Sequence, residues 1–68
     1  MTCTKLKDFD KENPNYQNLI DSIKEGKVLL DENNGSATIL HEPLETRFPL
    51  GMKAYLENNG YIVDLVQT

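Results

Sequence analysis

The side chains best suited to acid–base chemistry stand together near the middle of the chain. His41 and Glu42 are adjacent, and Glu45 and Arg47 follow shortly after them. A histidine can act as a general base near neutral pH, and a neighbouring carboxylate can orient its ring. The missing part is a nucleophile, because no serine, threonine or cysteine lies in a recognisable nucleophile motif. We therefore expect His41 to end a strand beside solvated loop charges, and we expect no enzymatic activity.

Metal and cofactor sites are not expected either. Cys3 and His41 are the only cysteine and histidine, whereas a structural zinc normally takes four ligands. The segment Asp31-Glu32-Asn33 does not have the alternating oxygen ligands of a calcium loop. The four glycines are isolated from one another, so none forms a phosphate-cradling loop. We expect no cofactor.

The charge balance bears on the class of partner. The chain has 11 acidic and 7 basic residues and a formal net charge of −4. Only Lys5, Lys7 and Lys11 lie close together among the basic residues. Nucleic-acid binding depends on lysine and arginine that neutralise phosphates, so direct binding is disfavoured. An acidic surface can instead imitate a nucleic-acid backbone and occupy a basic cleft, although no long acidic run is present.

The length of 68 residues predicts one domain with a small core. Such a chain buries only roughly 60% of the surface that its unfolded form exposes. Small domains gain support from disulfides, a metal or oligomerisation, and a single cysteine excludes an internal disulfide. Two expectations stay open, a well-packed monomer and a homodimer.

The beginning of the chain and its hydropathy indicate a compartment. The first eight residues lack the apolar core of a signal peptide, and no stretch approaches the ~20 apolar residues of a transmembrane helix. A lone cysteine is typical of a reducing environment. We expect a cytoplasmic protein with no membrane contact.

Residues 1–12 are mixed and highly charged, with Leu6 and Phe9 as their large apolar groups, and we expect a flexible N-terminal arm. A helix is expected from about residue 14 to 25, because Asn13 suits the N-cap and Pro14 the first helical position. Gly26 ends it. Its apolar stripe consists of Tyr16, Leu19, Ile20 and Ile23.

Two short apolar runs, residues 27–31 and 36–41, flank the turn signal Asn33-Asn34-Gly35 and predict a β-hairpin.

Residues 42–48 are expected to be a loop between Pro43 and Pro49. A second helix is expected to start near Pro49 and to end at the Asn58-Asn59-Gly60 segment. Residues 61–66 predict the last strand. The apolar stripe of the second helix consists of Phe48, Met52, Tyr55 and Leu56.

The element order predicts the fold class. Residues 13–68 should form a single α+β domain with the order α-β-β-α-β. The hairpin strands pair antiparallel, and the helical connection from the second strand to the third favours a parallel right-handed crossover. The expected result is a three-stranded mixed sheet with two helices packed on one face.

The last strand has two unequal faces. Tyr61, Val63 and Leu65 share a wholly apolar face that should meet the helices. Ile62 and Val66 share the other face, which is more apolar than a solvated face needs to be. Three possibilities remain for what covers this second face: the N-terminal arm through Leu6 and Phe9, a second copy of the chain, or a foreign protein.

No family motif is present. The chain resembles short accessory proteins of bacteriophages and mobile elements in its size, its acidity and the glycines between its expected helices and strands. This resemblance implies a protein-binding modulator. The leading hypothesis is a small acidic, non-enzymatic accessory or regulatory module that binds an unidentified protein. The alternatives are a structural or assembly protein that acts as a homo-oligomer and an acidic nucleic-acid mimic that blocks a DNA-binding protein. The candidate partner-binding residues are His41, Glu42, Glu45, Arg47, Phe48, Ile62 and Val66.

Overall fold

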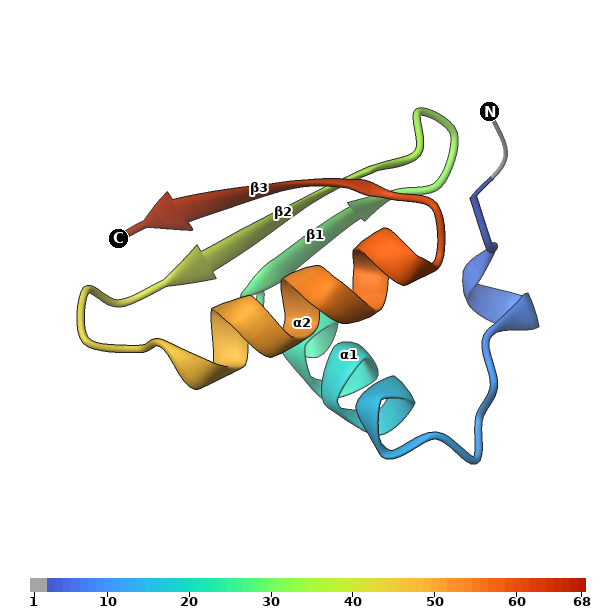
Figure 1. The fold of residues 1–68 in the computed structure, drawn as a ribbon, viewed down its shortest axis with the longest axis horizontal. Coiled ribbons are helices and arrows are strands. Elements are labelled where there is room, and N and C mark those ends of the chain that lie inside the picture. Colours follow the sequence, from blue (N-terminus) through green and yellow to red (C-terminus); the bar gives the residue numbers. More distant parts are fainter. Residues whose placement is uncertain (1–2) are drawn as a thin grey trace.

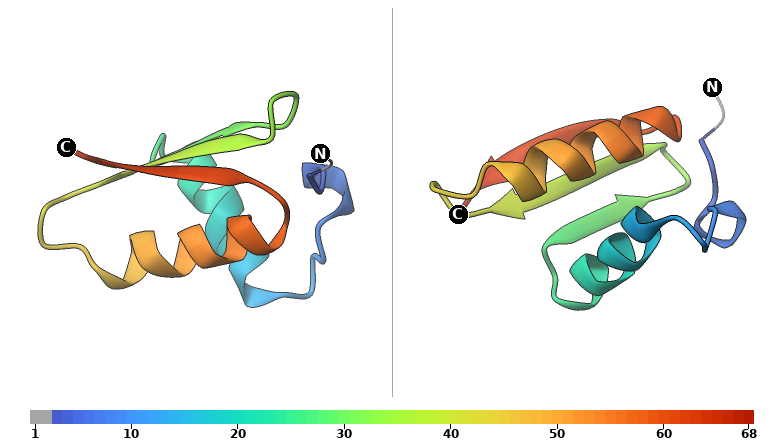
Figure 2. Two further views of the ribbon diagram at one scale, coloured as in Figure 1. Left: turned by 45° about the horizontal axis from the view of Figure 1, so that its top comes forward. Right: turned by 60° about the horizontal axis from the view of Figure 1, so that its bottom comes forward.

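The computed structural model describes residues 3–68, which form one sheet with two α-helices on one of its faces (Figures 1 and 2). The predicted α+β fold class and the element order α-β-β-α-β are confirmed. No helix in this range is both long and apolar enough to cross a membrane. In chain order the elements are the 3-10 helix η1 (Leu6–Asp8), α1 (Pro14–Lys24), β1 (Val28–Asp31), β2 (Ser36–His41), α2 (Arg47–Asn58) and β3 (Ile62–Gln67).

The central strand of the sheet is β2. It pairs antiparallel with β1, with Val28 opposite Ile39, and parallel with β3, with Ile39 opposite Leu65. The mixed pairing is therefore as predicted from the two connections, a short turn after β1 and a helix after β2. Both β1 and β3 are edge strands (Figure 1).

The N-terminus of α1 has the predicted cap. The side chain of Asn13 accepts a hydrogen bond from the backbone N–H of Asn15 at 2.9 Å, and Pro14 occupies the first turn. These contacts satisfy one of the N–H groups that a helix start leaves unpaired. Leu19 is fully buried at the centre of the apolar stripe, and the helix ends at Lys24.

The helix α2 begins at Arg47, two residues before the predicted start at Pro49. Proline is tolerated there because the N–H groups of a first helical turn have no intrahelical acceptor. Arg47 and Phe48 therefore belong to the helix and not to the preceding loop. Met52 and Leu56 are buried against the sheet, as their spacing predicts.

The hairpin turn between β1 and β2 is organised by Asp31. Its carboxylate accepts hydrogen bonds from the backbone N–H groups of Asn33 and Asn34 and from the side-chain amide of Asn34, the last at 2.6 Å. The side-chain bond from Asn34, followed by its backbone bond, lowers the pKa of the Asp31 carboxyl. Gly35 closes the turn with φ +65°, a left-handed conformation that favours glycine.

The segment before α1 takes part in the core, which differs from the expected separate arm. Phe9 is buried and its ring lies near those of Tyr16, Tyr55 and Tyr61, with centroids 5.6–6.5 Å apart. Leu6 is half-buried against the same cluster. The packing boundary of the domain therefore lies N-terminal to residue 13. The buried apolar core consists of Phe9, Leu19, Val28, Ala37, Ile39, Met52, Leu56, Tyr61 and Val63.

Candidate interaction surface

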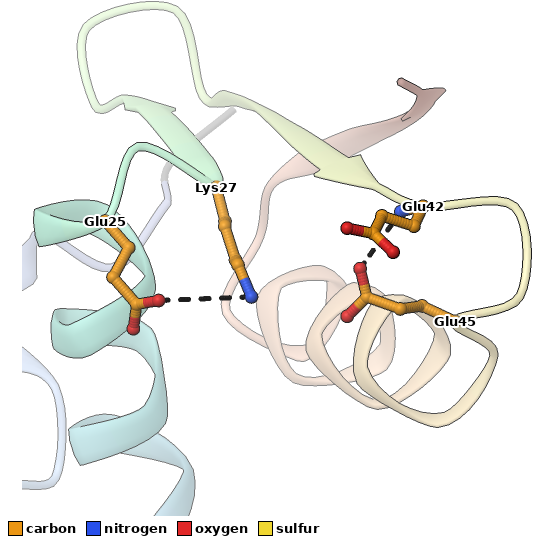
Figure 3. A network of polar contacts seen from close by, with 4 residues as sticks. All are labelled: Glu25, Lys27, Glu42 and Glu45. Carbon is orange, nitrogen blue, oxygen red and sulfur yellow. Dashed lines mark hydrogen bonds and ion pairs between the residues drawn. The ribbon is translucent and has the colours of Figure 1, made fainter.

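The predicted site residues of the loop after β2 form one local group. The ring nitrogen Nδ1 of His41 lies 2.9 Å from the carbonyl oxygen of Glu42. The backbone N–H of Glu42 donates to Oε1 of Glu45 at 3.0 Å (Figure 3). The N–H of Glu45 donates back to the carbonyl of Glu42 at 3.1 Å. These contacts fix the shape of the loop. They also engage one ring nitrogen of His41 and one oxygen of Glu45 with neighbouring backbone.

A lysine from the start of the hairpin faces this group. Nζ of Lys27 lies 3.9 Å from Oε1 of Glu25 and 5.7 Å from the ring centroid of Phe48 (Figure 3 shows the ion pair). Both partners of the ion pair are largely exposed, so it contributes little to stability. Phe48 is half-buried against the core, whereas Arg47 is exposed. Phe48 is therefore a poor candidate for a free anchor, and Arg47 remains available to a partner.

Reactive hydroxyls and metal-ligating groups are the next feature of this region. Ser22 is buried in α1 and does not lie in the loop. Residues 3–68 contain no group of three or more histidine, cysteine or acidic side chains arranged to hold a metal ion. Leu44, which the sequence reading did not select, is 94% exposed between Pro43 and Glu45. A leucine in a short loop without a periodic partner is the sequence signal that would have identified it.

The second part of the predicted site is the sheet face that the helices leave open. Ile62 is 61% exposed there, Val66 is 42% exposed, and Leu29 of β1 lies on the same face. Val66 stands opposite Leu40 of β2, while Thr38 and Asp64 stand opposite each other in the middle. The open face therefore combines exposed aliphatic corners with a polar centre, and Ile62 and Val66 are part of it as predicted.

The N-terminal segment does not cover the open face. It lies in the helix layer at the turn end of the sheet (Figure 2). Thr4 donates its backbone N–H to the carbonyl of Asn59 at 2.8 Å, and the backbone N–H of Leu6 donates to the side chain of Glu32. Because Phe9 lies in the core between the helices and the sheet, the N-terminal arm is not the cover of the open face. A second copy and a foreign protein remain.

The structure therefore divides the seven predicted site residues into two groups. His41 to Phe48 lie at one end of the molecule, around the loop between β2 and α2. Ile62 lies on the open face near the opposite end, because it pairs with Ser36 at the hairpin turn. Val66 pairs with Leu40 beside the loop but points to the open face. The two groups do not form one continuous site.

A shallow groove runs along the outer side of the first hairpin strand. Two adjoining depressions of about 630 and 380 Å³ share Leu6, Glu32 and Asn33 in their linings. Lys5 lines the larger depression, and its ammonium group donates to the carbonyl of Glu32 at 3.0 Å. The cation is thus held by the protein's own backbone. The groove contains no cluster of groups that would fix a charged ligand.

Comparisons of the chain with models of protein families, with curated proteins and with solved structures found no match. The exposed surface of the molecule is therefore the basis of the functional proposal.

Proposed function

We propose that this protein is a small acidic, non-enzymatic binding module that attaches to a protein partner through the open face of its sheet. The observation that carries this proposal is the exposure of Leu29, Ile62 and Val66 on a face that no other segment of residues 3–68 covers. The solvated face of a mixed or antiparallel sheet is normally polar. Exposed apolar residues that share one face are typical of protein-binding surfaces.

The free energy available from burying the exposed apolar side chains supports binding of useful strength. Full burial of one valine, leucine or isoleucine side chain contributes roughly 1.5–3 kcal/mol. Ile62 and Leu29 are each more than half exposed in the folded chain, so a partner that covers them gains a large part of this free energy. Each 1.4 kcal/mol changes a dissociation constant by about tenfold. Covering this face can therefore account for a specific complex.

The loop between β2 and α2 adds a second contact. Leu44 and Arg47 are both exposed at this end of the molecule. Leucine supplies apolar area, and arginine is among the residues that contribute most to interfaces. A reducing compartment such as the cytoplasm belongs to the same proposal, because the only cysteine of the chain, Cys3, is free.

The test is capture of partners from the native host with the whole chain as bait, followed by mass spectrometry. Ile62→Asp places a charge at the most exposed aliphatic side chain of the proposed contact and should weaken retention at least about tenfold. Asn18→Asp adds the same charge at an exposed position of α1 and should retain the partner as the wild type does. Circular dichroism checks that both variants are folded.

Two results would contradict the proposal. The first is the absence of any retained protein, and the second is equal retention by the wild type and Ile62→Asp. Retention that falls steeply with added salt would instead favour imitation of a nucleic acid, since apolar contacts depend weakly on salt.

A further inference from the structure

The outer edge of β3 presents unpaired backbone groups. The N–H of Ile62 donates to the carbonyl of Gly35 at 2.8 Å, and the N–H of Thr68 donates to the carbonyl of His41 at 2.8 Å. In a parallel pair, alternate residues direct both backbone groups to the neighbouring strand. Val63, Leu65 and Gln67 therefore direct their N–H and C=O groups away from β2, to the free edge. An extended chain could pair with all three.

This edge lacks the usual protection against such pairing. Natural edge strands are shortened, bulged, or carry proline or lysine. β3 spans Ile62–Gln67 with unbroken pairing to β2, and its one charged residue is Asp64. The other edge strand, β1, has four residues and lies beside α1 and the N-terminal segment (Figure 2, right). β3 is the longer and more open edge.

Apolar side chains flank the β3 edge on both faces of the sheet. Ile62 and Val66 are exposed on the open face, and Leu65 is 38% exposed on the helix face. A strand added to this edge would bury these side chains as well as pair its backbone.

We propose that the partner at this edge is a second copy of the chain, with the two β3 strands antiparallel about a two-fold axis at Leu65. This inference goes beyond the proposed function, because it assigns the β3 edge to a second copy and leaves the open face available to another protein. In this register Leu65 pairs with Leu65 of the second copy, and Val63 pairs with Gln67. Every outward backbone group of Val63, Leu65 and Gln67 then has a partner, and the two sheets become one continuous sheet.

The side chains that would stand opposite each other favour this register over the two registers whose axis is shifted by one residue. An axis at Asp64 would place the two carboxylates directly opposite each other, which is destabilising. An axis at Val66 would place Gln67 opposite Leu65 and would not pair the two leucines. The axis at Leu65 places Asp64 opposite Val66 instead. The β3 edge is thus complementary to itself, as a two-fold interface requires.

A small domain also gains from this association. A chain of this size buries only roughly 60% of its unfolded surface by itself, and oligomerisation is a common source of additional stability. The net charge of −4 on each copy opposes association. Added salt screens this repulsion, so the dimer should become tighter as the salt concentration rises.

The first test is sedimentation velocity over a range of protein concentrations. The wild type should dimerise reversibly. Leu65→Pro should remain monomeric, because proline blocks the strand edge while the N–H that it removes is not used within the monomer. Leu65→Lys, which places two ammonium groups about the axis, should raise the dissociation constant at least about tenfold. Asn18→Lys, which adds the same charge at an exposed position of α1, should dimerise as the wild type does.

The second test reads the register by disulfide formation in a Cys3→Ser background. Leu65→Cys should form a covalent dimer quickly under mild oxidation, because its counterpart is directly opposite. Ile62 is more exposed than Leu65, but the counterpart of Ile62→Cys is displaced by six residues along the strand, about 20 Å, so this variant should react slowly. Equal rates for the two variants would overturn the register.

A wild type that is monomeric at every concentration, or a dimer that Leu65→Pro leaves intact, would overturn this inference. Those results would leave the proposed function standing if a foreign protein is still captured and Ile62→Asp still releases it. If no protein is captured and the chain does not dimerise, both the proposed function and this inference are contradicted.

Discussion

Tyr61 is the residue that connects the N-terminal segment to the sheet. Its ring is buried at the start of β3, with its centroid 6.3 Å from that of Phe9. Its hydroxyl donates to the carbonyl oxygen of Thr4 at 2.6 Å. Burial, with smaller contributions from Cys3 and Glu32, raises the pKa of the Tyr61 phenol well above its ordinary value. One side chain therefore joins two segments that are distant in the sequence.

This raised pKa predicts an alkaline loss of stability. The folded state holds the phenolic proton more tightly than the unfolded state, whose tyrosine pKa is about 10. The resulting contribution to stability is complete below about pH 10 and is lost as pH rises through the higher pKa of the folded state. Tyr61→Phe should be less stable than the wild type by about 0.5–1.5 kcal/mol at neutral pH, and the difference should shrink above about pH 10. Urea denaturation at several pH values measures this, and parallel pH curves would contradict it.

The sequence allowed prediction of one half of this contact. The alternation of Tyr61, Val63 and Leu65 placed Tyr61 in the core, which is confirmed. The acceptor, Thr4, could not be predicted, because a hydrogen bond between residues so far apart depends on the tertiary arrangement and leaves no periodic pattern. Leu65 shared the predicted face but remains partly exposed, since β3 is an edge strand with no neighbour beyond it.

Among the elements, α2 carries a glycine that its packing does not use. Gly51 lies inside the helix, is exposed, and a Cβ added to it meets nothing within 4 Å. Glycine inside a helix costs about 0.5–1 kcal/mol relative to alanine. Gly51→Ala should therefore raise the free energy of unfolding by about this amount, as measured by urea denaturation.

Gly26 provides the matched control for this substitution. A Cβ at Gly26 also meets nothing within 4 Å, but its φ of +78° is left-handed. Gly26→Ala should lower stability by about 1–2 kcal/mol, because only backbone strain separates the two sites. Equal effects at Gly51 and Gly26 would contradict the role of backbone conformation.

The helix and strand boundaries were predictable where local chemistry decides them. Asn13 and Pro14 marked the start of α1, and Asn34-Gly35 marked the hairpin turn. The start of α2 was predicted two residues late, because a proline also suits the interior of a first turn. Leu50 lay outside the predicted stripe of the second helix, and the structure shows it exposed.

At the scale of the whole molecule, residues 3–9 close one end of the core. Phe9 fills the space among three tyrosines, and Thr4 and Leu6 attach the segment to the turns beyond α2 and β1. A small domain derives only about 3–5 kcal/mol of stability from its core. A single core residue can therefore determine whether the chain folds.

Phe9→Ala should accordingly lower the free energy of unfolding by about 3–5 kcal/mol and leave much of the protein unfolded at 25 °C. Phe9→Leu retains most of the buried volume and should cost less. Far-ultraviolet circular dichroism during thermal unfolding distinguishes the two variants. A wild-type transition in Phe9→Ala would show that the N-terminal segment is dispensable.

The global arrangement was predictable from connection lengths, but the role of the N-terminal segment was not. A short turn required β1 and β2 to be antiparallel, and a helical connection favoured a parallel β3, as the structure confirms. Leu6 and Phe9 stand alone among charged residues, so no periodicity indicated that they would pack. The two halves of the predicted site were separated for a related reason, because one lies in a loop and the other on a strand face.

The parallel pairing of β2 and β3 also determines how the molecule would bear mechanical load. β2 begins at Ser36, at one end of this pairing, and β3 ends at Gln67, at the other end. Tension applied between these two points acts along β3 and loads all of its hydrogen bonds to β2 at once, in shear. The bonds cannot open one after another as they would in a peeled hairpin. Pulled between these two points, the pair of β2 and β3 is loaded in its most resistant direction.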